Sequence, residues 1–136
     1  EHHANLSGMA GAVAFCTIGA YAYIGAKTRM SRDVPPYMIV EGHDGRVRGV
    51  NVIGLQRSGV SEEDLEALRV SFRRIWRSDR PRKVVVDEML QEGGHNAHVQ
   101  NLLDSLERTE QGLKGRYRES LRQEFVEQGQ RRILPV

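Results

Sequence analysis

Histidine and cysteine have the widest chemical range in this chain, because both side chains ligate metals and act as bases or nucleophiles. His95 and His98 are three residues apart, so a helix would place both on one face, where they could share a metal ion. No cysteine or carboxylate stands at a spacing that would complete such a site, and we expect no metal. Cys16 is the one cysteine, which excludes an internal disulfide and favours a reducing compartment. We interpret it as a small buried apolar residue rather than a nucleophile.

Two groups of basic residues lie in the C-terminal half of the chain. The first group favours equally a solvated helix face and a surface that steers an acidic protein partner. The second alternates with glutamates, which predicts a plain amphipathic helix. The net charge of +2 and the pI near 8.9 are too mild to argue for nucleic acid. The first group is Arg73, Arg74, Arg77, Arg80, Arg82 and Lys83, and the second is Arg116, Arg118, Arg122, Arg131 and Arg132.

A repeat of six residues runs through the first 34 residues. A small or aliphatic residue at one fixed position of a six-residue period is typical of a parallel β-helix, in which that side chain points into the stacked interior. The alternative is two ordinary strands, 13–18 and 21–24, joined by a turn that contains glycine. The repeated positions are Leu6, Ala12, Ile18, Ile24 and Met30.

The six-residue repeat ends before Pro35 and Pro36, which have no backbone N–H to donate to a strand ladder. The rest of the chain follows other patterns. Five glycines among short apolar runs at 38–40 and 50–53 predict one or two short strands within loop. From Ser61 onward the apolar residues recur at helical spacing, and Ser61 with Asp64 forms a helix-capping pattern. Helices are predicted over about 61–77, 83–91, 99–111 and 117–129, and the last residues are expected to fray.

The domain organisation follows from these patterns. We expect β-helix coils at 1–37, a connection of loop and short strands at 38–60, and a helical domain at 61–136. No stretch approaches the roughly 20 apolar residues of a membrane span, and no signal peptide is expected. Residue 1 is Glu rather than Met, so we expect processing, truncation or upstream residues that are not in the chain.

Three segments in this order resemble the UDP-N-acetylglucosamine O-acyltransferases of lipid A biosynthesis, a hexapeptide-repeat acyltransferase family. The second and third segments together are specific to that family, whereas many unrelated acyltransferases share the hexapeptide repeat. The resemblance is good over residues 1–77 and weaker up to Lys114, and the last 22 residues extend past the usual end of the family. The segments are 15–20 (F-C-T-I-G-A), 33–37 (D-V-P-P-Y) and 49–57 (G-V-N-V-I-G-L-Q-R).

The resemblance implies the end of a left-handed parallel β-helix followed by a small C-terminal helical domain, in a cytoplasmic homotrimer. It implies transfer of a 3-hydroxyacyl group from acyl carrier protein to the sugar 3-hydroxyl of UDP-N-acetylglucosamine. The acyl carrier protein thioester is then the acyl donor, and no bound cofactor is expected. In the family a histidine is the general base and backbone N–H groups stabilise the oxyanion. That histidine and its orienting aspartate would lie upstream of Glu1, so no catalytic residue is expected in this chain.

The resemblance also assigns substrate-binding roles. Asn51 matches a family position that contacts the UDP-sugar, and Arg57 matches an arginine that contacts phosphate, for which a guanidinium fork is suited. Ala26 matches the position that limits acyl-chain length, and its methyl group would shorten the pocket relative to glycine. His2 and His3 fall past the active-site histidines and are expected to be exposed residues on an outer corner.

At four positions this chain lacks the charged or polar side chain that the family pattern has. Ile53 stands where an acidic contact is usual, and Ser58 stands where a second arginine is common. Val13 and Ala14 replace a His-Gln pair beside the acyl-donor cleft.

Three functions therefore remain open from the sequence. The first is the C-terminal portion of an acyltransferase, inactive by itself. The second is a non-catalytic module that trimerises or binds acyl carrier protein or nucleotide sugar. The third and weakest is a nucleic-acid binder through the basic helices, which would show strongly salt-dependent binding.

Overall fold

The first part of the chain forms stacked coils of a parallel β-helix in a computed structural model, which describes residues 1–127 and places side chains up to residue 122. The strands of the coils are β1 (Asn5–Leu6), β2 (Gly11–Ala12), β3 (Tyr23–Ile24) and β4 (Arg29–Met30). Leu6 pairs in parallel with Ile24, and Ala12 with Met30, 18 positions later in each case. Three six-residue steps thus make one coil, which confirms the predicted repeat over the alternative of two ordinary strands.

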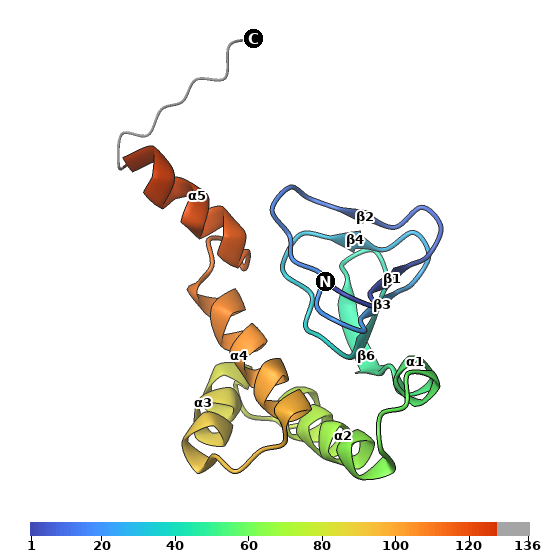
Figure 1. Cartoon of the computed structure of the whole chain (residues 1–136). Coiled ribbons are helices and arrows are strands. Elements are labelled where there is room, and N and C mark those ends of the chain that lie inside the picture. The colour runs from blue at the N-terminus through green and yellow to red at the C-terminus, as the bar shows by residue number, and fades with distance from the viewer. Residues whose placement is uncertain (128–136) are drawn as a thin grey trace.

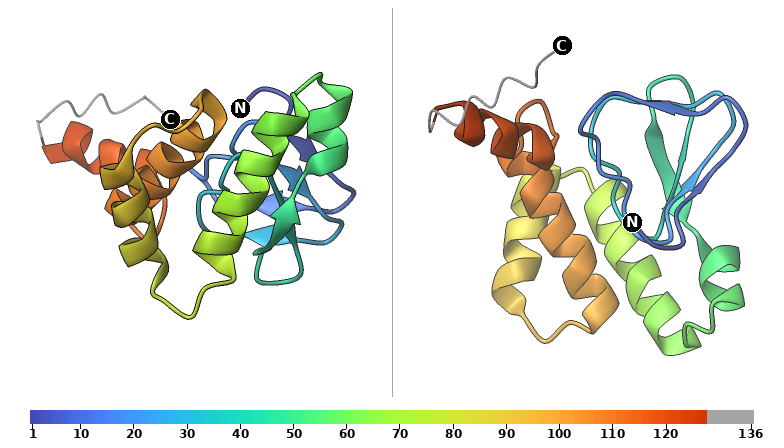
Figure 2. Two further views of the ribbon diagram at one scale, coloured as in Figure 1. Left: turned by 90° about the horizontal axis from the view of Figure 1, so that it is seen from below. Right: turned by 45° about the horizontal axis from the view of Figure 1, so that its top comes forward.

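A second six-residue period marks the corners of the coils. Five residues other than glycine have φ angles between 55° and 64°, the left-handed region that turns the chain sharply. The triangular outline of the coils in Figure 2 follows from these regular turns. The corner residues are His3, Met9, Phe15, Tyr21 and Lys27.

Of the five predicted interior positions, Ile24 and Met30 are buried in the core of the coils, Ile18 is partly buried, and Leu6 and Ala12 are exposed. Ile24 is 0% exposed and Met30 is 2% exposed, and they pack with Ala22, Val34 and Val40. Leu6 occupies the same position one coil earlier but is 48% exposed, because it lies at the outer end of the stack. Burial of the aliphatic positions between coils is therefore the main force that stacks them.

A hairpin closes the stack on the other side. Strand β5 (Met38–Glu41) pairs in parallel with β3 and antiparallel with β6 (Arg46–Val50), which gives the sheet order β1-β3-β5-β6. The prediction of one or two short strands between 38 and 59 is thus confirmed, with two strands present.

The run 50–53 was predicted as strand, and this prediction was wrong beyond Val50. Helix α1 (Val52–Arg57) begins there, with Asn51 as its N-cap and Leu55 fully buried. The local preference of Val52 and Ile53 for strand is overridden because the capped helix buries Leu55 against the core.

Four further helices follow in the order predicted, as Figure 1 shows. Ser61 caps the first of them, since its Oγ accepts a hydrogen bond from the Asp64 N–H at 3.1 Å. The predicted end of the last helix near Gly129 lies outside the described residues. The helices are α2 (Glu62–Trp76), α3 (Arg82–Glu92), α4 (Ala97–Gln111) and α5 (Tyr117–Glu127).

The helices pack into a core of their own that reaches the end of the β-helix. Helix α2 lies against β6 and against α3 and α4. Leu65, Leu68, Leu102 and Leu103 are fully buried there, together with Met38 from β5. Figure 1 shows α4 and α5 rising beside the coils, so one flank of the β-helix faces helices. Within the described part of the chain, no helix is long and apolar enough to cross a bilayer.

Candidate functional site

Asn51 joins helix α1 to the corner of the coils at Tyr21. Its side-chain Oδ1 accepts a hydrogen bond from the Gly54 N–H at 3.2 Å, and its Nδ2 donates to the Tyr21 carbonyl oxygen at 2.9 Å. Its own N–H donates to the Tyr37 carbonyl oxygen at 2.7 Å. Both ends of the amide are therefore occupied by the backbone, and Asn51 fixes the position of α1.

Gly54 has a specific reason to be glycine. A Cβ at this position would lie 2.9 Å from the Asn51 side-chain Cγ and closer still to its Nδ2. The sequence showed Gly54 only as part of a motif, and its role follows from its place three residues after an N-cap asparagine.

Arg57 lies in the last turn of α1 and is exposed. Among residues 1–122, no carboxylate lies in ion-pair contact with its guanidinium group. Ile53 is 64% exposed on the same helix, so an apolar surface stands where the family pattern has an acid. The structure thus places Asn51, Ile53 and Arg57 together on α1, with Arg57 open to solvent.

A stack of aromatic rings supports the corner to which Asn51 is bonded. The His3 ring lies over Tyr21 with centroids 4.8 Å apart, and Tyr21 lies over Tyr37 at 6.1 Å. Asn101 on α4 donates a hydrogen bond to the Tyr37 hydroxyl at 2.7 Å, and the edge of His98 contacts the Tyr37 ring. Burial raises the pKa of Tyr37 above its ordinary value. The corner is thereby held by the coils and by helix α4, and His2 and His3 are exposed on it as expected.

Ala26 lies at the other end of the same side of the coil, next to the corner residue Lys27. Ala26 is exposed. Tyr21, whose carbonyl oxygen accepts the hydrogen bond from Asn51, lies at the opposite end of this side. Tyr21 and Ala26 are five residue steps apart, which spans about 16 Å at the rise of a strand. Ala26 and the Tyr21 carbonyl oxygen that Asn51 contacts therefore lie at opposite ends of this side of the coil.

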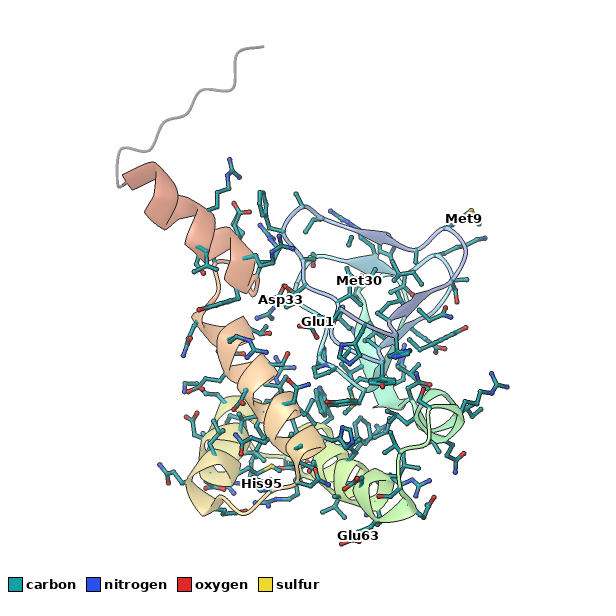
Figure 3. All side chains as sticks on the ribbon, in the orientation of Figure 1. Glu1, Met9, Met30, Asp33, Glu63 and His95 are labelled. Atoms are coloured by element: carbon teal, nitrogen blue, oxygen red, sulfur yellow. The ribbon has the colours of Figure 1, made fainter. Side chains whose placement is uncertain are left out.

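The D-V-P-P-Y segment connects the coils to the helices. Asp33 Oδ1 accepts from the Thr17 N–H at 2.7 Å and Oδ2 accepts from the Tyr117 N–H at 2.8 Å. Figure 3 shows Asp33 between the coils and the C-terminal helices. Pro36 lies directly against Gly19 of the previous coil, where a Cβ would collide with the proline backbone. The motif is therefore explained by packing between coils and helices.

His95 and His98 do not lie on the same helix. His95 precedes α4, and its Nε2 lies 2.6 Å from the Met89 carbonyl oxygen. His98 lies within α4, with its Nε2 3.9 Å from Asp64 Oδ2. The assumption that both histidines stand on one helix was therefore wrong. Within the described part of the chain, no group of three or more potential ligands could hold a metal ion.

Cys16 is partly buried at the end of the third corner, and its Sγ lies 3.7 Å from the Met30 carbonyl oxygen. Burial raises the pKa of this thiol, and the nearby Asp33 carboxylate raises it further. A raised pKa keeps the thiol protonated near neutral pH and so makes it a poor nucleophile.

The first basic group is largely neutralised by carboxylates. Arg74 bonds Glu92 through two nitrogens, and similar pairs hold Arg73, Arg80, Arg82 and Lys83. Arg77 lies over the Phe72 ring instead. These pairs favour the solvated helix face over a surface that steers an acidic partner.

Comparison with known proteins agrees with this architecture. Residues 33–114 match the family described as UDP N-acetylglucosamine O-acyltransferase, domain 2. The chain belongs to this acyltransferase family. The acyl-[acyl-carrier-protein]–UDP-N-acetylglucosamine O-acyltransferase of Synechocystis is 44% identical over 117 residues, which cover 85% of this chain and 42% of that protein. The enzyme of the same name from Vibrio parahaemolyticus is 34% identical over 116 residues, 83% of this chain and 43% of its own length.

Solved structures of the acyltransferase family share the fold. The Arabidopsis UDP-N-acetylglucosamine acyltransferase aligns with a TM-score of 0.73 at 30% identity, covering 79% of this chain and 39% of that one. The Acinetobacter baumannii protein aligns with a TM-score of 0.70 at 30% identity, covering 78% and 42%. This chain thus spans about two fifths of the length of these acyltransferases. The match to the family model ends at residue 114.

Proposed function

We propose that this chain is the C-terminal portion of an enzyme that transfers a 3-hydroxyacyl group from acyl carrier protein to the 3-hydroxyl of UDP-N-acetylglucosamine. Family membership across residues 33–114 is the observation that carries this proposal. The relatives are named for this reaction and keep the name at 34–44% identity over most of the chain.

Within that enzyme, α1 contributes to binding of the nucleotide sugar. The exposed Arg57 guanidinium offers a fork of donors to the diphosphate, which suits it better than a single ammonium group. Asn51 holds α1 through Gly54 and Tyr21, and it keeps one amide hydrogen for the substrate. Ala26 limits the length of the acyl chain, and it lies at the end of the coil side opposite Tyr21.

The general base belongs to coils that precede Glu1 in the whole enzyme. The coils have the left-handed sense of the family, and three copies assemble in the cytoplasm. The placement of Ala26 and Arg57 in different parts of one chain supports a trimer, because a trimer would bring α1 of one copy to the coils of another.

The test is an acyl-transfer assay on the natural protein that contains this chain, with UDP-N-acetylglucosamine and 3-hydroxyacyl carrier protein as substrates. Arg57→Lys should raise the KM for UDP-N-acetylglucosamine about tenfold, because the fork is lost while the charge is kept. Arg77→Lys, on α2, is the matched control and should change nothing.

The non-catalytic alternative has one observation in its favour, namely the apolar Val13, Ala14 and Ile53 at positions where the family pattern is polar. It predicts that the natural protein binds UDP-N-acetylglucosamine in a titration but forms no acylated product. That combination would replace the enzymatic proposal.

A further inference from the structure

One corner of the β-helix carries an aromatic ring in three successive coils. His3, Tyr21 and Tyr37 occupy this corner, because strands β1, β3 and β5 pair in parallel just after it. All three residues have φ angles in the left-handed region, at 55°, 57° and 68°. Their rings form one column, with centroid separations of 4.8 Å and 6.1 Å. The column therefore runs along the stack of coils, from the exposed His3 to the last coil.

Tyr37 is the most constrained residue of this column. It is a bulky residue in the left-handed region and is only 4% exposed. The coil that ends at Tyr37 is shorter than the one before it, since Tyr23 pairs with Ile39, 16 positions later, and not 18. Backbone strain of this kind persists only where surrounding contacts hold it, and it is concentrated at functional sites.

The contacts of Tyr37 connect Asn51 with helix α4. Its carbonyl oxygen accepts the Asn51 N–H at 2.7 Å, and its ring stacks on Tyr21, whose carbonyl oxygen accepts from Asn51 Nδ2 at 2.9 Å. Both hydrogen bonds that Asn51 donates therefore end on the pair of stacked tyrosines. On the other side, the Tyr37 hydroxyl accepts from Asn101 Nδ2 at 2.7 Å, and the His98 ring contacts the Tyr37 ring edge-on at 5.4 Å.

We propose that Tyr37 is a positioning residue for the nucleotide-sugar site: it fixes Asn51 through the backbone and the Tyr21 ring, and Asn101 of α4 fixes Tyr37. Because Tyr37 is buried, it acts through Asn51 and not by contact with the substrate. The helical domain thereby takes part in nucleotide-sugar binding. This inference rests on the proposed function, in which Asn51 contacts the UDP-sugar.

The experiment is a calorimetric titration of the natural protein with UDP-N-acetylglucosamine. Asn101→Ala should raise the Kd about threefold to tenfold, because the Tyr37 hydroxyl loses the donor that fixes its ring. Gln100→Ala is the matched control and should leave the Kd unchanged. Gln100 also donates one hydrogen bond from α4, to Asp104 Oδ1 at 2.8 Å, but its partner lies on α4 itself. Both variants should lose similar thermal stability, so stability alone does not account for a difference in Kd.

Two variants of Tyr37 separate the ring from the hydroxyl. Tyr37→Phe keeps the stacked ring and should match Asn101→Ala, and the double variant should be no weaker than either single one, because all three lose the same bond. Tyr37→Leu loses the ring as well and should raise the Kd about tenfold or more. In the acyl-transfer assay the KM for UDP-N-acetylglucosamine should rise in parallel with the Kd, while kcat at saturation stays within about twofold of wild type. Circular dichroism confirms that the variants fold.

An unchanged Kd in Asn101→Ala and Tyr37→Phe would overturn the inference and leave Tyr37 with a packing role only. Equal increases in Asn101→Ala and Gln100→Ala would overturn it too. The proposed function fails separately. A protein that transfers acyl groups with an unchanged KM in these variants keeps its function and loses the inference. A protein whose variants bind UDP-N-acetylglucosamine more weakly, but which forms no acylated product, keeps the inference and loses the function. A wild-type protein that does not bind UDP-N-acetylglucosamine loses both.

Discussion

Asp33 and Tyr117 are 84 residues apart in sequence and are joined by a hydrogen bond of 2.8 Å from the Tyr117 N–H to the Asp33 carboxylate. The other carboxylate oxygen accepts from the Thr17 N–H, so one side chain connects a coil, the start of α5 and the D-V-P-P-Y segment. Asp33 is therefore the residue on which the attachment of the C-terminal extension depends most directly.

Replacing Asp33 tests that attachment. Asp33→Ala should lower the free energy of unfolding by about 2–4 kcal/mol, because two charge-assisted hydrogen bonds are lost and two N–H groups are left without partners. Urea denaturation followed by circular dichroism measures the change. Asp44→Ala is the control. Its pair with Arg46 is about 70% exposed, so the loss there should stay below about 0.5 kcal/mol. Equal stability of both variants would contradict the role of Asp33.

Replacing Gly54 tests the attachment of α1. Alanine normally stabilises a helix relative to glycine, but here its Cβ would displace the Asn51 amide from its two backbone partners. Gly54→Ala should therefore cost about 1–2 kcal/mol of unfolding free energy, the usual loss for an N-cap. Gly49→Ala is the matched control, since a Cβ there meets nothing within 4 Å. A thermal melt in which Gly54→Ala gains stability would show that α1 tolerates the change.

Thr28 offers a gain in stability. Thr28 is 1% exposed, and its buried hydroxyl has no hydrogen-bond partner among the described residues. Thr28→Val replaces the hydroxyl by a methyl group of the same shape and should stabilise the fold by about 1 kcal/mol. Thr109→Val should act in the opposite direction, because the Thr109 hydroxyl donates to the Ser105 carbonyl oxygen at 2.9 Å. A destabilised Thr28→Val protein in urea titration would mean that the hydroxyl is satisfied.

Ala26 tests the acyl-chain assignment in the natural protein. Ala26→Gly removes one methyl group and should shift the preference of acyl transfer toward longer 3-hydroxyacyl chains, by about tenfold in relative kcat/KM. Competition between carrier proteins loaded with different chain lengths measures this preference. Unchanged selectivity would show that Ala26 does not end the pocket.

The sequence alone determined the elements whose physics is local or periodic. Ile24 and Met30 are interior because a six-residue period leaves one position per step that faces the stack. Ser61 and the apolar stripe after it fixed the start and the buried face of α2, since caps and helical spacing act within a few residues. The three segments that resemble the acyltransferase family can likewise be recognised from the sequence alone.

The tertiary structure decided what depends on contacts between distant residues. Val52 and Ile53 prefer strand, but burial of Leu55 and the bonds of Asn51 to Gly54 and Tyr21 make them helical. The start of α5 lies against the coils through the hydrogen bond from the Tyr117 N–H to the Asp33 carboxylate, across 84 residues of sequence. Propensity and spacing carry no information over such separations, because only packing and long-range hydrogen bonds fix them.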